Sequence, residues 1–191
     1  MSLQESQQPS NTTTSLPANA GSRRGCGSSP LDADTPKGRD AIRWARRGAA
    51  AFLRAYPTLR LAETDQSEPA DVDGILYSML QGNTIKGVLE IKSRYMTLDH
   101  LMGSFNGEWL ITKNKIDRGM DIAHGLRCPF VGLLVLPNSK ICLSRLIADK
   151  DRNLMCIMRE EVTKTSASVN GGEMTGLNAF IDMKDAKQFE I

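Results

Sequence analysis

Apolar residues recur every three or four positions between residues 36 and 56, as they do on the buried face of an amphipathic helix. Thr35 is a suitable N-cap residue, Pro36 suits the first helical position, and Pro57 ends the pattern. We therefore expect one long helix at the start of the folded part of the chain. Its buried face would consist of Ile42, Ala45, Ala49, Phe52, Leu53 and Tyr56.

Shorter apolar segments follow, separated by turn residues, and they predict strands and further helices. Residues 97–105 read as a short helix or irregular segment, and residues 114–126 as a helix capped by Asn114. Turn residues at 81–84 predict a hairpin, and Asn170-Gly171-Gly172 predicts a second hairpin near the C-terminus. This order of elements indicates a mixed α/β or α+β domain. The expected strands are 58–64, 71–80, 87–93, 108–112, 129–137, 139–147, 160–169 and 173–183.

The first 36 residues differ in composition from the rest of the chain. They are rich in Ser, Thr, Gln, Asn, Gly and Pro and contain no Val, Ile or aromatic residue. Such a segment cannot bury enough apolar surface to offset its chain entropy. We therefore expect a disordered tail over residues 1–36 and one folded domain over residues 37–191.

The net charge and the cysteine content do not identify a binding partner, but they indicate the cellular compartment. The net charge of +2 is too small to indicate a partner, and no apolar run is long enough for a transmembrane helix, so no membrane partner is expected. The N-terminus lacks the basic and apolar regions of a secretory signal. The four cysteines form no C-x-x-C motif and no zinc-ligand spacing with histidine. We expect a cytoplasmic protein, located in the host cytoplasm if it is encoded by a virus.

The strand at residues 87–93 carries two charged residues in an otherwise apolar setting. Glu90 and Lys92 are two positions apart, so their side chains share one face of the strand. Burying such groups is costly unless they are paired or bind a ligand. Asp71 and Asp73 lie on the preceding strand, its hairpin partner, also two positions apart. Carboxylates on adjacent strands are suitable ligands for Mg²⁺ or Mn²⁺, and a nearby lysine could serve a metal-bound water.

An Asp at a strand hairpin, then E-x-K on a strand followed by a helix and another strand, resembles the PD-(D/E)xK nuclease superfamily. In this chain the pattern reads EPADVDGILY followed by VLEIKSR. The resemblance covers about residues 37–147 and implies a restriction-endonuclease-like core, which is a central mixed β-sheet flanked by helices, with the C-terminal β-hairpin as an addition. It also implies that Asp73 and Glu90 bind the metal, helped by the backbone carbonyl of Ile91, while Lys92 activates the attacking water.

The choice between the two aspartates stays open in the sequence. Asp73 leads through Gly74 directly into the apolar strand, and a glycine there would leave room for metal and phosphate beside the backbone. Pro69, which would be the proline of the superfamily motif, is spaced better for Asp71. We therefore take Asp73 as the ligand and keep Asp71 as its alternative.

Two other features of the motif have alternatives. Many members of the superfamily take a further acid from the first helix, where this chain offers Asp40, and Glu63 or Glu68 could replace it. Glu90 and Lys92 are also compatible with an edge-strand salt bridge that only blocks aggregation.

Basic residues outnumber acidic residues seven to one between residues 37 and 60, which gives the first helix a strongly basic exposed face. Such a face could bind the phosphate backbone of DNA without reading its sequence. Two lysines at the start of the later helix could bind the scissile phosphate. The expected DNA-binding residues are Arg39, Arg43, Arg46, Arg47, Lys113 and Lys115.

These features predict a Mg²⁺-dependent deoxyribonuclease that hydrolyses phosphodiester bonds by water attack. The small size suits an exonuclease, a structure-directed endonuclease or a virus-encoded nuclease. The sequence contains no zinc finger, recognition-helix motif or P-loop that would indicate a substrate sequence or a motor function. The alternative is a catalytically inactive nucleic-acid-binding protein of the same fold. Nothing in the sequence indicates the oligomeric state.

Overall fold

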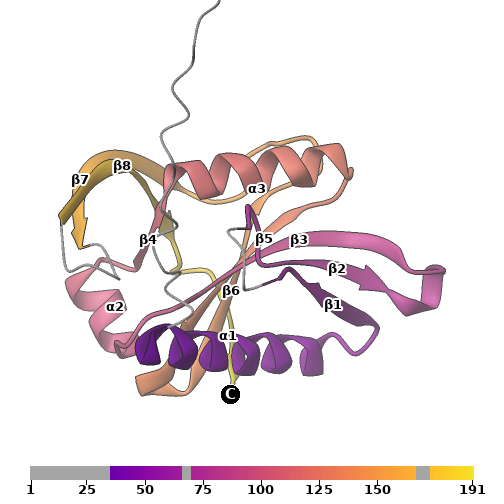
Figure 1. Ribbon diagram of the computed structural model, residues 1–191, viewed down its shortest axis with the longest axis horizontal. Helices are drawn as coiled ribbons and strands as arrows, with labels where there is room; N and C mark the ends of the chain where they lie inside the picture. The colour runs from indigo at the N-terminus through magenta and orange to yellow at the C-terminus, as the bar shows by residue number, and fades with distance from the viewer. Residues whose placement is uncertain (1–34, 66–69, 167–172) are drawn as a thin grey trace, which may run out of the picture.

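The computed structural model describes residues 35–65, 70–166 and 173–191 (Figure 1). The expected N-terminal tail and the turn at Asn170-Gly171-Gly172 lie outside these residues, apart from Thr35 and Pro36. In chain order the elements are α1 (Pro36–Ala55), β1 (Leu59–Glu63), β2 (Gly74–Ser78), η2 (Met79–Gln81), β3 (Thr84–Ser93), α2 (Leu98–Ser104), β4 (Glu108–Thr112), α3 (Lys113–Gly125), β5 (Phe130–Leu136), η3 (Pro137–Ser139), β6 (Ile141–Ala148), β7 (Met158–Ser166), β8 (Glu173–Asp182) and β9 (Lys187–Glu190).

Six strands form the main sheet, in the order β1-β2-β3-β5-β6-β9. The pairs β1–β2, β2–β3, β5–β6 and β6–β9 are antiparallel, whereas β3 and β5 are parallel. The parallel pair is possible because the chain between β3 and β5 crosses over through α2, β4 and α3. The prediction of an α+β domain with a mixed sheet and helices is therefore confirmed at this level, together with the hairpin of β2 and β3.

Three strands form a second sheet, in the order β4-β8-β7. The predicted C-terminal hairpin is present as the antiparallel pair β7–β8, but it does not stand alone, because β4 pairs with the other side of β8. The sequence indicated β4 as a strand without indicating its partner, since strand pairing depends on residues far away in the chain. The short strand β9 was not expected, and it extends the main sheet beyond β6.

The two faces of the main sheet carry different cores. Val88 of β3 packs in a cluster that includes Ile116 of α3, whereas Leu89 packs in a cluster that includes Phe52 of α1. Figure 1 shows α1 and α3 on opposite sides of the sheet. Successive residues of a strand point to opposite faces, so Glu90 points to the side of α3, like Val88.

The helix α1 lies close to its expected limits. The Thr35 hydroxyl accepts a hydrogen bond of 2.9 Å from the backbone N–H of Gly38, so the predicted N-cap is confirmed. Gly48 brings the helix close to the sheet, because a Cβ atom there would lie 2.3 Å from Val135 Cγ2. In the described ranges no helix, α1 with its 20 residues included, is long and apolar enough to cross a membrane.

The helix α3 begins earlier than expected, and the prediction of Asn114 as its cap is wrong. The helix starts at Lys113, immediately after the last residue of β4, and Thr112 occupies the cap position without a side-chain hydrogen bond. No loop separates the strand from the helix, so the end of β4 determines where the helix begins. As a result, Lys113 and Lys115 both lie in the first turn of α3.

Candidate active site

Asp73 is held against β3 immediately before β2 begins. Its backbone N–H donates to the carbonyl of Leu89 at 3.0 Å, and its carboxylate accepts a hydrogen bond of 2.6 Å from the backbone N–H of Ile91. These two bonds place the Asp73 carboxylate beside the β3 backbone that carries Glu90 and Lys92. The Nζ atom of Lys92 lies 3.9 Å from Asp73 Oδ2. The structure therefore brings together the three residues that the motif suggested.

Thr64 strengthens this arrangement, and no feature of the sequence indicates this role. Its hydroxyl donates to the carbonyl of Val72 at 2.8 Å, and its backbone N–H donates to the carbonyl of Asp73 at 3.1 Å. The residue after β1 thus holds the segment before β2 in place. The role becomes visible only when β1 and β2 are paired.

Glu90 is the buried member of the cluster, with 0% of its side chain exposed. The Nζ atom of Lys92 lies 2.8 Å from Glu90 Oε1, and the Nζ atom of Lys115 lies 3.9 Å from Oε2. Among the residues that the structure describes, no donor makes a well-directed hydrogen bond to either oxygen of Glu90. A buried carboxylate normally has its oxygens satisfied, whereas this one is compensated mainly by the charge of the ammonium that lies 2.8 Å away.

The environment shifts the pKa values of both members of the pair. Burial raises the pKa of Glu90 above its ordinary value; the charge of Lys92 opposes this rise, and the charge of Asp73 adds to it. Burial acts to lower the pKa of Lys92, but the negative charges of Glu90 and Asp73 outweigh it, so the pKa of Lys92 is raised. Lys92 is therefore protonated at neutral pH, and in this state it is a counter-ion rather than a base.

The two lysines of α3 have different partners. Lys115 reaches the cluster, because its ammonium donates to the carbonyl of Ala70 and lies 3.9 Å from Glu90 Oε2. Lys113 forms ion pairs with Asp117 and, at 3.3 Å, with Glu160 of β7. Of the two lysines, Lys115 is thus the one beside the carboxylates.

Asp71 does not share the position of Asp73. The chain bends at residues 71–73 and β2 begins only at Gly74, so the expectation that both aspartates lie on one strand face is wrong. Asp71 is 53% exposed and lies 3.8 Å from Arg118 of α3, whereas Val72 between the aspartates is buried. The bend thus turns Asp71 outward.

The reason for a glycine at position 74 also differs from the expectation. A Cβ atom on Gly74 would lie 2.6 Å from Leu61 Cδ1 and 2.8 Å from the carbonyl oxygen of Ala62. Both atoms belong to β1. The Leu61 side chain packs in the same apolar cluster as Phe52 of α1. The glycine allows β1 to approach β2; it does not provide space for metal or phosphate.

Of the other acids considered as metal ligands, the two that the structure describes form ion pairs away from the cluster. Glu63 pairs with Arg46 at 3.1 Å. Asp40 pairs with Arg43 and accepts a hydrogen bond from the hydroxyl of Tyr95. Glu68 and Pro69 lie outside the described residues. The structure describes no group of three or more His, Cys, Asp or Glu side chains arranged to hold a metal, so a metal here would depend on two carboxylates, backbone oxygens and water.

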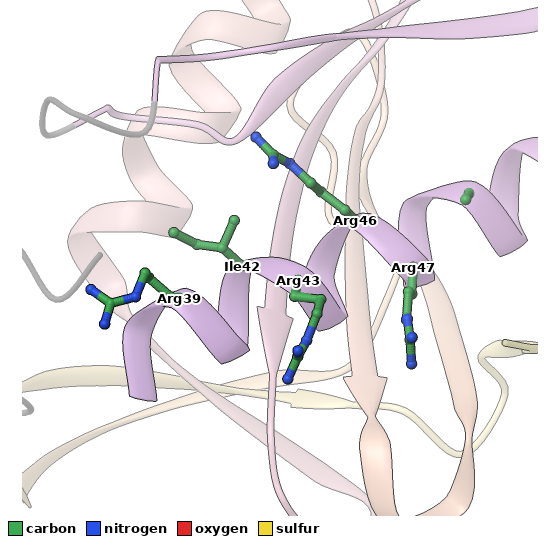
Figure 2. A pocket seen from close by; sticks show the side chains of 6 residues that line it. Arg39, Ile42, Arg43, Arg46 and Arg47 are labelled. Carbon is green, nitrogen blue, oxygen red and sulfur yellow. The ribbon is translucent and has the colours of Figure 1, made fainter. Parts of the chain in front are cut away.

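Four of the five arginines of α1 line a shallow depression of about 550 Å³ (Figure 2). Figure 2 shows Arg43 and Arg47 pointing to one side of the helix, whereas Arg46 points to the other side. Since α1 covers the Leu89 side of the sheet, this basic surface is built on the opposite side of β3 from Glu90. The lining residues are Arg39, Ile42, Arg43, Arg46, Arg47 and Ala50.

Comparison of the chain with protein-family models, with curated proteins and with solved structures gave no match. Two carboxylates and two ammonium groups converge at one point, on rigid neighbouring elements. Such a set can bind a divalent cation and a phosphate oxygen side by side.

Proposed function

We propose that this protein is a metal-dependent nuclease that hydrolyses phosphodiester bonds in DNA. The observation that carries the proposal is the Glu90 carboxylate, fully buried beside Asp73, with two oxygens that accept no well-directed hydrogen bond in the described part of the chain. A divalent cation would use those lone pairs. Asp73, Glu90 and the backbone carbonyl of Ile91 would hold Mg²⁺ or Mn²⁺, whose chemistry there is to polarise a phosphate oxygen and acidify a water.

The lysines supply positive charge to this reaction. Lys92 is protonated when no metal is present, so we assign it to orienting the attacking water and stabilising negative charge on the phosphate, rather than to accepting the proton. Lys115, in the first turn of α3, lies 3.9 Å from the other oxygen of Glu90 and donates to the carbonyl of Ala70, and we assign it to binding a phosphate oxygen. When Lys92 or Lys115 moves from Glu90 to the substrate, the charge of the bound metal would compensate Glu90 in its place.

The topology supports the resemblance to the PD-(D/E)xK superfamily. Asp73 immediately precedes β2, and Glu90 and Lys92 lie on β3, the antiparallel partner of β2. The chain then crosses over through α2, β4 and α3 to the parallel strand β5. A restriction-endonuclease-like core requires a mixed sheet with this order of motif, helix and strand. In this proposal the arginines of α1 add non-specific affinity for the phosphate backbone.

A second candidate function has its own supporting observation. Lys92 and Lys115 already compensate the charge of Glu90, so the cluster does not need a metal for charge balance. This arrangement also suits a protein of the same fold that binds nucleic acid and does not cut it. Metal binding separates the two candidates.

The test measures metal binding and cleavage together. Melting temperatures are recorded in EDTA and in increasing Mg²⁺ or Mn²⁺, and single-stranded, duplex and branched DNA are offered as substrates. At a metal concentration 100 times the dissociation constant, we expect a stabilisation of about 2.7 kcal/mol, or roughly 5–11 °C. Glu90→Gln keeps the shape and should lose both the stabilisation and cleavage. If the unmodified protein shows neither, the non-cleaving candidate replaces the nuclease.

A further inference from the structure

The strand β7 is an exposed edge of the second sheet. Among the described residues its strand partner is β8, and Figure 1 shows β7 at the outer margin of the molecule. The third strand, β4, ends at Thr112, opposite Asn178 of β8. Beyond that point β7 and β8 continue as a two-stranded ribbon. An edge of this kind presents backbone N–H and C=O groups on which another strand can pair.

The centre of this edge is apolar. Val162 of β7 lies directly across from Leu177 of β8, and the two side chains are 65% and 46% exposed. Edge strands of soluble proteins usually carry a charged residue or a proline at such a position, which discourages pairing with a strand of another chain. Here the charged residues flank the apolar centre instead, with Glu160 two positions before Val162 and Lys164 two positions after it.

We propose that β7 pairs with β7 of a second copy of this chain, antiparallel, around a two-fold axis at Val162. In that register Val162 meets Val162 of the second copy, and Glu160 lies opposite Lys164 of the second copy. The symmetry repeats the second pairing, so two Glu–Lys pairs flank one apolar contact on the same face. Leu177 of each copy extends the apolar contact on either side. The two sheets would join into one continuous sheet of six strands.

The charge pattern selects this register over its neighbours. A two-fold axis at Glu160 would set two glutamates directly opposite each other. A two-fold axis at Glu161 would likewise set two glutamates opposite each other, and an axis at Thr163 would set Val162 opposite Lys164. Like charges directly opposite destabilise a strand pair, whereas opposite charges stabilise it. The register around Val162 combines one apolar pair with two opposite-charge pairs and is therefore favoured.

Both faces of β7 make contacts within one copy. On the face of Val162, the Glu160 carboxylate lies 3.3 Å from Lys113 of α3, and on the other face Arg159 is held more tightly. Arg159 donates to both carboxylate oxygens of Glu108 on β4, at 2.8 and 2.7 Å, and also pairs with Glu161. Its guanidinium lies over the ring of Phe180, 3.8 Å from the ring centre. These contacts order the strand before any second copy arrives, which reduces the entropy lost on pairing. Charge self-complementarity makes a second copy a better occupant of this edge than an unrelated peptide.

The experiment is sedimentation velocity of the full chain over a range of concentrations. We expect a monomer–dimer equilibrium, which Val162→Lys should abolish or weaken at least about tenfold. Leu80→Lys is the matched control, because Leu80 is 77% exposed and lies in the η2 turn rather than on β7. Circular dichroism and melting confirm that each variant folds. A monomer at all concentrations, or a dimer unaffected by Val162→Lys, would overturn the proposal.

Charge exchange tests the register itself. Lys164→Glu alone and Glu160→Lys alone should each dimerise at least about tenfold more weakly, because symmetry doubles each repulsive pair. An equimolar mixture of the two variants should regain the dimer, since each Glu of one then faces a Lys of the other. Single variants that dimerise like the unmodified chain, or a mixture that stays monomeric, would refute this register. If a strand-forming peptide binds the edge while the chain stays monomeric, the occupant is a different protein and the proposal fails.

Discussion

Replacing Lys92 by methionine tests whether the cluster is built for a metal. The substitution keeps the length and most of the volume of the side chain and removes the ammonium that lies 2.8 Å from Glu90 Oε1. Glu90, with 0% of its side chain exposed, would then keep only Lys115, at 3.9 Å, as a cationic neighbour. Removing one partner of a buried ion pair typically costs about 3–5 kcal/mol.

That cost corresponds to a large change in melting temperature. In a chain of this size each kcal/mol shifts the melting temperature by about 2–4 °C, so Lys92→Met in EDTA should melt roughly 6–20 °C lower. The raised pKa of Glu90 favours uptake of a proton by the isolated carboxylate, so the lower part of this range is expected. Saturating Mg²⁺ should recover most of the loss, because the cation takes over the compensation of Glu90. Cleavage should stay lost, because the charge that orients water and phosphate is missing.

The matched control is the double variant Glu90→Gln/Lys92→Met, which removes both charges. Neutral replacement of a buried ion pair is often tolerated, so this protein should melt close to the unmodified chain and should not respond to Mg²⁺. Differential scanning fluorimetry in EDTA and in Mg²⁺ measures all three proteins. If Lys92→Met loses stability and Mg²⁺ does not restore it, the pair is structural and the metal assignment is wrong. If it loses no stability in EDTA, Glu90 does not depend on Lys92.

Three further outcomes are expected. Asp73→Ala should abolish metal-dependent cleavage and Asp71→Ala should retain it, because Asp73 is held beside Glu90 whereas Asp71 faces Arg118. Nuclease assays on the two variants measure this, and the reverse result would make Asp71 the ligand. Arg43→Ala/Arg47→Ala should reduce the slope of log affinity against log salt by up to about 1.8 in binding titrations with duplex DNA, and an unchanged slope would place the DNA elsewhere. Thr35→Ala should lower the unfolding free energy by about 1 kcal/mol in urea denaturation, because the cap on Gly38 is lost, whereas Thr35→Ser should retain it.

Local features of the fold could be predicted from the sequence because they depend on residues that are close together in the chain. The limits of α1 follow from a cap, a proline and a helical apolar period, and they are close to those expected. The alternation along β3 correctly placed Glu90 and Lys92 on one face, opposite Leu89, because side chains of a strand alternate whatever its partners are. The strand order and the second sheet were not accessible in this way, since β4 contains no signal for its pairing with β8.

The composition of the candidate site was decided by tertiary structure. The sequence showed that a carboxylate and an ammonium share a strand face, and it suggested Asp71 or Asp73 as their companion. Only the bend before Gly74 separates the two aspartates, because it allows the Asp73 carboxylate to accept the Ile91 N–H and turns Asp71 towards solvent.

The partners of the lysines and the position of the arginines also depend on the tertiary structure. Lys113 and Lys115 look equivalent in the sequence, yet the direct passage from β4 into α3 directs Lys115 to Glu90 and leaves Lys113 with Glu160. The basic face of α1 is evident from its spacing, but packing places it on the opposite side of β3 from the carboxylates. Periodicity along the chain determines which face of an element is buried; which distant charges meet there depends on how the elements pack, because electrostatic contacts form over a few ångströms in space and not over a few positions in sequence.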